Sequence, residues 1–182
     1  MNRSINTKKL IIMAAFTAAA LIIFIIEAQV PLPIPVPGAK LGLANAVTLF
    51  ALFYPVGGGQ DRPAVLTGSN VFAILICRIL LGTILTGRIL TLILSFSGGV
   101  LGFAAQIVMR RVVSEKQIWV CGAAGAVFHN IGQIIAVIII TGAPSIAAYL
   151  PVLIIIGVVS GTITGLIAQF TLSRLSKSNN KW

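Results

Sequence analysis

Acidic residues are the scarcest chemical group in this chain. There are three in 182 residues, Glu27, Asp61 and Glu115, and no two of them are close in sequence. An enzyme that handles diphosphates through magnesium needs clustered carboxylates. No P-loop pattern follows the glycine-rich stretch at 57–60, so the chain does not drive itself with ATP. We therefore expect no intrinsic catalysis and no cofactor.

Cysteine and histidine are also rare. Cys77 and Cys121 fall in separate apolar runs without CxxC spacing, which indicates packing roles and neither a metal site nor a disulfide framework. The single histidine, His129, has no carboxylate or cysteine near it in sequence. This isolation argues against nucleophilic catalysis.

Charged residues make up only 9% of the chain, while 58% are hydrophobic and the mean hydropathy is +1.07. A soluble domain carries about 25% charged residues. The composition therefore indicates an integral membrane protein. A net charge of +10 would suggest nucleic acid for a soluble protein, but here the basic residues lie in short loops and tails. We expect the bilayer, and no nucleic acid, as the partner of these charges.

The apolar runs predict a single all-α membrane domain with six transmembrane helices. A spanning helix needs about 20 apolar residues. The expected spans are 9–28, 43–56, 64–86, 89–113, 118–141 and 147–175. With six spans, ten of the 13 lysines and arginines fall on the side that holds both termini. The positive-inside rule makes that side cytoplasmic, which predicts a multi-pass protein of the cytoplasmic membrane.

The longest interruption of the apolar sequence is the segment from Glu27 to Asn45. Four prolines at alternate positions in 31–37 remove backbone donors and fix φ, so this segment is not helical. Such backbone cannot face lipid. We interpret it as a lid at the outer membrane face.

Arg78 is the clearest charge inside a predicted span. It lies eight residues before Thr86, about 12 Å along a helix, which is more than snorkelling covers. One interpretation is a structural ion pair with Glu27 or a cap on helix carbonyls. The other is a contact with an anionic ligand.

Three polar residues of the fifth span, His129, Asn130 and Gln133, share a helix face with small residues. They favour either hydrogen bonds between helices or the lining of a binding cavity. Four further polar residues fall at the outer end under the predicted topology: Glu27, Lys40, Asn45 and Arg88.

Glu27, Lys40, Arg78 and Arg88 together carry a net charge of +2 at the outer end. This charge predicts a small ligand with carboxylate or phosphate character. Arg88 could instead anchor a helix end in the headgroups.

Ala14 and Ala18 form a small-xxx-small pair that allows close approach of another helix. Nine residues separate Ala18 from Glu27, which is half a turn apart on a helix. The alanines therefore point away from the expected cavity. They favour a docking face for another subunit, with packing inside the bundle as the alternative.

Three blocks carry a resemblance to a known family: PGAKLGLANAVTLF at 37–50, CRILLGTILTG at 77–87 and GAAGAVFHNIGQ at 122–133. In this order they resemble the Gx transporter family, also labelled heptaprenyl diphosphate synthase component I. That family is similar to the substrate-binding S components of energy-coupling factor transporters.

The resemblance implies six helices, cytoplasmic termini and a vitamin-like or isoprenoid-related ligand bound near the outer face beneath the first loop. It also implies that Ala14 and Ala18 dock a transmembrane coupling subunit driven by ATPases. Two alternatives are a non-catalytic accessory subunit of a prenyl diphosphate synthase or quinone pathway, and a stand-alone secondary carrier. The carrier has few membrane-embedded acids for ion coupling.

Overall fold

The computed structural model describes residues 7–29, 42–54, 66–114 and 117–179, and its regular structure within these residues is entirely helical. This confirms the all-α prediction for the described part of the chain. In chain order the helices are α1 (Thr7–Glu27), α2 (Asn45–Phe53), α3 (Gly68–Thr86), α4 (Ile89–Arg110), α5 (Ile118–Thr141), the 3₁₀ helix η2 (Pro144–Tyr149) and α6 (Leu150–Asn179).

Glycine and proline set the ends of the helices. Gly87 after α3 and Gly142 after α5 have φ of 64° and 65°, and the N–H of each donates to the carbonyl four residues earlier. Left-handed glycine is a common way to end a helix. Pro144 and Pro151 lie in the first turns of η2 and α6, where a missing N–H costs no intrahelical bond.

Among the residues that the structure describes, five helices are long and apolar enough to cross a membrane: α1, α3, α4, α5 and the η2–α6 unit. The outer side of α6 shows why this chain needs lipid. Ile155, Val159, Ile163 and Ile167 recur every four residues, and each is more than half exposed. A continuous apolar row of this kind is unfavourable in water and favourable against acyl chains. The chain is a multi-pass membrane protein.

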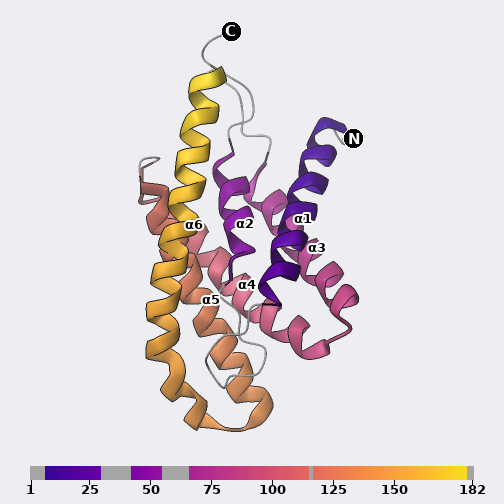
Figure 1. Cartoon of the computed structure of the whole chain (residues 1–182), viewed down its shortest axis with the longest axis vertical. Coiled ribbons are helices and arrows are strands. Elements are labelled where there is room, and N and C mark those ends of the chain that lie inside the picture. Colours follow the sequence, from indigo (N-terminus) through magenta and orange to yellow (C-terminus); the bar gives the residue numbers. More distant parts are fainter. Residues whose placement is uncertain (1–6, 30–41, 55–65, 115–116, 180–182) are drawn as a thin grey trace.

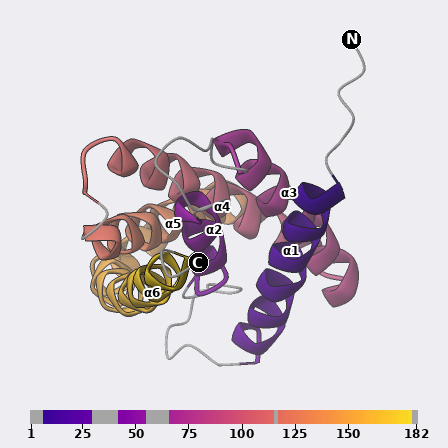
Figure 2. The ribbon, with the colours of Figure 1, turned by 90° about the horizontal axis from the view of Figure 1, so that it is seen from above.

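The short helix α2 occupies the centre of the bundle. Its nine residues extend about 14 Å, roughly half of a 30 Å hydrocarbon core. Both views place it between the α5–α6 side and the α1–α3 side (Figures 1 and 2), and it packs against all five long helices. The expected second span, 43–56, thus contains a half-length helix, and six complete crossings stay a prediction.

The helices alternate in direction along the bundle (Figure 1), so that α1 begins and α6 ends at the same end of the molecule. The six expected spans would produce the same arrangement. The cytoplasmic location of that end stays a prediction from the distribution of basic residues.

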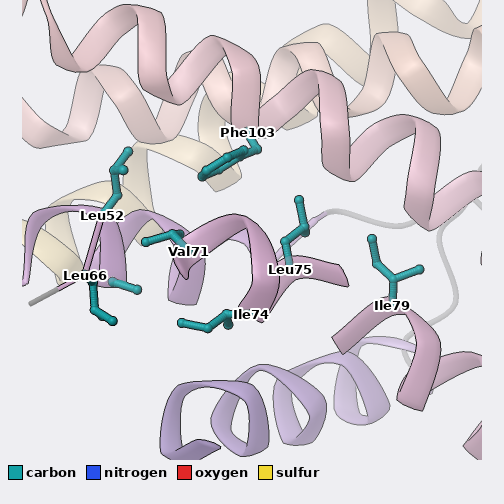
Figure 3. Close-up of a cluster of buried hydrophobic side chains, with 8 residues drawn as sticks. Leu52, Leu66, Val71, Ile74, Leu75, Ile79 and Phe103 are labelled. Carbon is teal, nitrogen blue, oxygen red and sulfur yellow. The ribbon is translucent and has the colours of Figure 1, made fainter. Parts of the chain in front are cut away.

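One apolar cluster joins α2, α3 and α4 (Figure 3). Phe103 of α4 lies over Val71 and Leu75 of α3, and Leu52 of α2 completes the group. These side chains are at most 6% exposed. The cluster packs α2 beside α3 and extends to Ile79, the neighbour of Arg78 in sequence.

Glycines bring α5 and α6 into backbone contact. A Cβ on Gly161 would lie 2.5 Å from the carbonyl oxygen of Gly122, and a Cβ on Gly165 would lie 2.6 Å from Cα of Trp119. In lipid the hydrophobic effect does not drive helices together. Close packing of this kind is therefore a main source of helix association.

A Gly161→Val substitution should push α5 and α6 apart. Backbone atoms cannot give way as a flexible side chain can, so we expect a loss of about 1–3 kcal/mol or more. The melting temperature of the purified protein in detergent measures this loss. Ile163→Val, on the exposed side of the same helix, is the control and should change little; equal melting temperatures for the two variants would contradict the close packing.

Candidate functional site

The candidate site is built around the turn that begins α2. Gly42 has φ of 79°, and its carbonyl accepts a 2.9 Å hydrogen bond from the N–H of Asn45. A Cβ on Gly42 would lie 2.9 Å from Cδ2 of His129. Glycine is therefore required here twice, once for the left-handed backbone and once for the space taken by the imidazole.

Glu27 connects the end of α1 to this turn. Its carboxylate oxygen Oε1 accepts hydrogen bonds from the backbone N–H of Gly42 and, at 3.2 Å, of Leu43. The side chain is only 4% exposed. Charge-assisted bonds of this kind are among the stronger ones in proteins. Glu27 thus holds together the two described ends of the segment that the sequence predicts to be a lid.

Arg78 enters the cluster from α3 and is 3% exposed. Its Nη2 donates to Oδ1 of Asn45 at 3.1 Å, and its charge is attracted by Glu27. This geometry is compatible with both interpretations of Arg78, as a structural group and as a contact for a ligand. An Asn–Arg bond and an attractive carboxylate hold the guanidinium, while Nε has no hydrogen-bond partner among the described residues.

His129 and Gln133 enter from α5 and are 3% and 1% exposed. Nε2 of Gln133 and Nε2 of His129 are 3.0 Å apart. The amide nitrogen can only donate, so the ring nitrogen accepts and a neutral imidazole carries its proton on Nδ1. The ring lies against Gly98 of α4, where a Cβ would be 2.8 Å from Nδ1. These two residues thus fix the α5 side of the cluster.

Asn130 follows His129 but points to a different neighbour. Its Nδ2 donates to the carbonyl oxygen of Leu153 in α6 at 2.7 Å, next to Gly157. This is the interhelical hydrogen bond that the sequence offered as one alternative. Asn130 belongs to the α5–α6 contact and not to the group around Asn45.

On its α4 side the cluster lies against a glycine ridge, formed by Gly99 and Gly102, which have no side chains. Arg78 Nη2 lies 3.7 Å from the Cβ position of Gly99, and Asn45 Nδ2 lies 3.6 Å from that of Gly102. One turn further, Gln106 is 1% exposed, and its amide occupies the space where Gly125 of α5 has no side chain. The sequence places Gln106 on this glycine face, which predicts tight packing within the bundle; a single polar residue on such a face is too weak a signal to indicate a binding role.

The structure thus brings together five of the residues singled out in the sequence: Glu27, Asn45, Arg78, His129 and Gln133. Arg88 lies apart, exposed at the first turn of α4, and Lys40 lies outside the described residues. The buried charges described here are one carboxylate and one guanidinium. The expected net charge of +2 loses the contribution of Arg88, which is exposed, and the contribution of Lys40 stays a prediction.

Ala14 and Ala18 lie on the opposite side of α1 and are exposed. They line an apolar groove of about 390 Å³ between α1 and α3, together with Cys77 and Leu81 among others. Their exposure agrees with the expected half turn between Ala18 and buried Glu27. Docking of a partner on this face stays a prediction.

Across the residues that the structure describes, no three histidine, cysteine or acidic side chains gather in a way that could hold a metal ion.

Gly42→Ala should destabilise the protein more than Gly87→Ala. Both glycines have positive φ, 79° and 64°, so both substitutions carry the backbone strain of about 1 kcal/mol. Only the new Cβ at Gly42 meets His129, because nothing lies within 4 Å of a Cβ at Gly87. Thermal melting in detergent measures both. Equal losses would show that the imidazole is not fixed against the turn.

Comparison with known proteins gives one family. The model of the family described as heptaprenyl diphosphate synthase component I matches residues 16–171, and the match includes all five residues of the cluster. Neither the search of curated proteins nor the search of solved structures gives a match. The match extends over most of the chain, and the chain therefore belongs to the heptaprenyl diphosphate synthase component I family.

Proposed function

We propose that this membrane protein binds a small solute with a carboxylate or phosphate group at the Asn45–Arg78–His129 cluster. It captures the solute at the outer membrane face and delivers it inward with energy-coupling subunits. The solute is an anionic, vitamin-like or isoprenoid-related molecule.

The observation that carries this proposal is a pair of buried donors without acceptors. Nε of Arg78 and Nδ2 of Asn45 have no hydrogen-bond partner in the described structure. Each such group costs about 1–3 kcal/mol when buried, and more when it is charged. The Asn45 amide cannot simply be reversed, because its Oδ1 already accepts from Arg78. An acceptor group of a ligand would satisfy both donors at once.

The charge distribution supports an anionic group at this position. The carboxylate of Glu27 is engaged by the N–H groups of Gly42 and Leu43, whereas Arg78 keeps an unused donor. A ligand anion would accept from Nε of Arg78 and from Asn45 Nδ2. Arginine suits carboxylates and phosphates because its donors lie in one plane.

The path of the chain supports access from one membrane face. The segment between the described residues Gln29 and Gly42 starts and ends beside the cluster, because Glu27 binds the turn at Gly42. We propose this segment, which lies outside the described residues, as the lid that the sequence predicts.

Transport needs an energy source, and the chain has no P-loop of its own. We propose that a transmembrane coupling subunit with ATPases supplies it and docks on the exposed Ala14–Ala18 face of α1. The apolar groove between α1 and α3 is next to these alanines. Small residues permit the close helix contact that such a docking requires.

The family description favours a second candidate, a non-catalytic membrane subunit that anchors or feeds a prenyl diphosphate synthase. Three acids in the whole chain leave no carboxylate cluster for a magnesium-dependent synthase reaction. Under this candidate the polar cluster is structural, and the protein carries a synthase subunit and no solute.

Arg78→Ala should lower solute retention by about 10- to 100-fold, the value of one or two hydrogen bonds to a charged group. Native mass spectrometry of the protein gently extracted from its own membrane measures the retained small molecules and subunits together. Arg88→Ala is the matched control, because Arg88 is exposed and outside the cluster. Unchanged retention in Arg78→Ala would refute the site. A spectrum that shows a synthase subunit and no solute favours the second candidate.

A double substitution, Ala14→Leu with Ala18→Leu, should remove the coupling subunits from the same spectrum and leave the bound solute in place. The larger side chains fill the space that a partner helix needs. Ala104→Leu, at an exposed alanine of α4, is the control. Partner subunits that stay bound to the double variant would place the docking surface elsewhere.

A further inference from the structure

We propose that Gln106 forms the far end of the same site and that the solute therefore carries a hydrogen-bond donor as well as its anionic group. This inference rests on the proposed function and names a further residue and a further property of the ligand. Gln106 would accept an N–H or O–H of the solute through Oε1, while Arg78 and Asn45 hold the acid group.

The first support is the state of the Gln106 side chain. It is 1% exposed, and its Oε1 is buried without a hydrogen-bond partner in the described structure. A buried amide that served only to fill space would be better replaced by an apolar side chain of similar length. An unused acceptor in this position is explained by a donor that arrives with a ligand.

The second support is the space made for Gln106. A Cβ on Gly125 of α5 would lie 2.6 Å from Nε2 of Gln106, so the amide occupies the place of a missing side chain. Gly102 of α4 lies equally close to the backbone of Gly125, with its Cβ position 2.7 Å from that carbonyl oxygen. Gly102 thus lets α5 approach α4 closely, and Gly125 leaves the room that the Gln106 amide occupies.

The third support is the position of Gln106 relative to the two donors. Asn45 Nδ2 lies 3.6 Å from the Cβ position of Gly102, and Gln106 follows Gly102 by one helix turn, about 6 Å along α4. Helical side chains point back toward the N-terminal turn. The Gln106 amide thus lies on the Asn45 side of its own Cα, on the same ridge.

The three polar groups therefore follow one another along α4. Arg78 lies beside Gly99, Asn45 beside Gly102, and Gln106 after it. The two residues nearest the start of α2 offer donors, and the last offers an acceptor. A solute that satisfies all three has an acid or carbonyl group at one end and an N–H or O–H about one helix turn away.

The test compares Gln106→Met with Gln169→Met. Methionine has a length similar to glutamine but no amide. Gln169 of α6 also has a buried Oε1 without a partner, yet it lies outside the cluster, so it controls for the loss of any buried amide. The two variants, wild type and Arg78→Ala are each incubated with a water-soluble small-molecule extract of the cells that produce the protein. Retained molecules are then identified by native mass spectrometry.

We expect Gln106→Met to retain the solute about tenfold less well than wild type, the value of one neutral hydrogen bond. Gln169→Met should retain it fully. The melting temperature of solute-free Gln106→Met should equal or exceed that of wild type, because the substitution removes a buried acceptor without a partner. The retained molecule should contain an acid group and an N–H or O–H donor.

Two outcomes would overturn the role of Gln106 and leave the proposed function intact: a solute lost by Arg78→Ala but held fully by Gln106→Met, or a retained solute without a donor. A lower melting temperature of Gln106→Met with unchanged retention would assign the residue to packing alone. If wild type retains no solute, the proposed function fails together with this inference.

Discussion

The buried guanidinium of Arg78 is the constraint on which the arrangement of this bundle depends. A charge at this depth in a membrane is expensive unless it is paired or solvated. Its compensation comes from Asn45 at the start of α2 and from the field of Glu27 at the end of α1. Because these partners lie on two other helices, the charge connects three helices at one point. The same point is where α2 begins, which explains why a helix of half the usual length is stable in the centre of the protein.

Glycine provides the room for this polar group. The polar side chains lie where Gly98, Gly99 and Gly102 of α4 have none, and the imidazole of His129 also fits against Gly42. A second set of glycines brings the backbones of α5 and α6 together, and Asn130 adds a hydrogen bond across that contact. Small residues therefore have two roles here. Between α5 and α6 they produce dispersion contacts, and beside α4 they make space for hydrogen-bonding groups.

Helix α1 connects the interior of the protein with its lipid-facing surface. Of the described elements it packs only against α2 and α3, and only 17% of its membrane-length stretch is buried. One end carries Glu27, which is buried and bound to the turn before α2, while the middle carries the exposed Ala14 and Ala18. A helix with few internal contacts can shift at a lower free-energy cost than α5, which is buried along half of its length. This is the physical basis for proposing that α1 carries the partner surface.

Composition and hydrophobic pattern alone determined the all-α membrane class, the place of each helix and the polar residues worth attention. They could do so because a long apolar run has few solutions in a bilayer. Helix α5 agrees with its predicted bounds, 118–141, to the residue. Only the tertiary structure decided which polar residues meet. Asn130 and His129 are neighbours in sequence, yet one bonds α6 and the other faces α4. Arg88 was grouped with Arg78 by topology but lies exposed at a helix start. Helix rotation and packing distance set these outcomes, and they depend on contacts between residues far apart in the chain, which a local pattern does not contain.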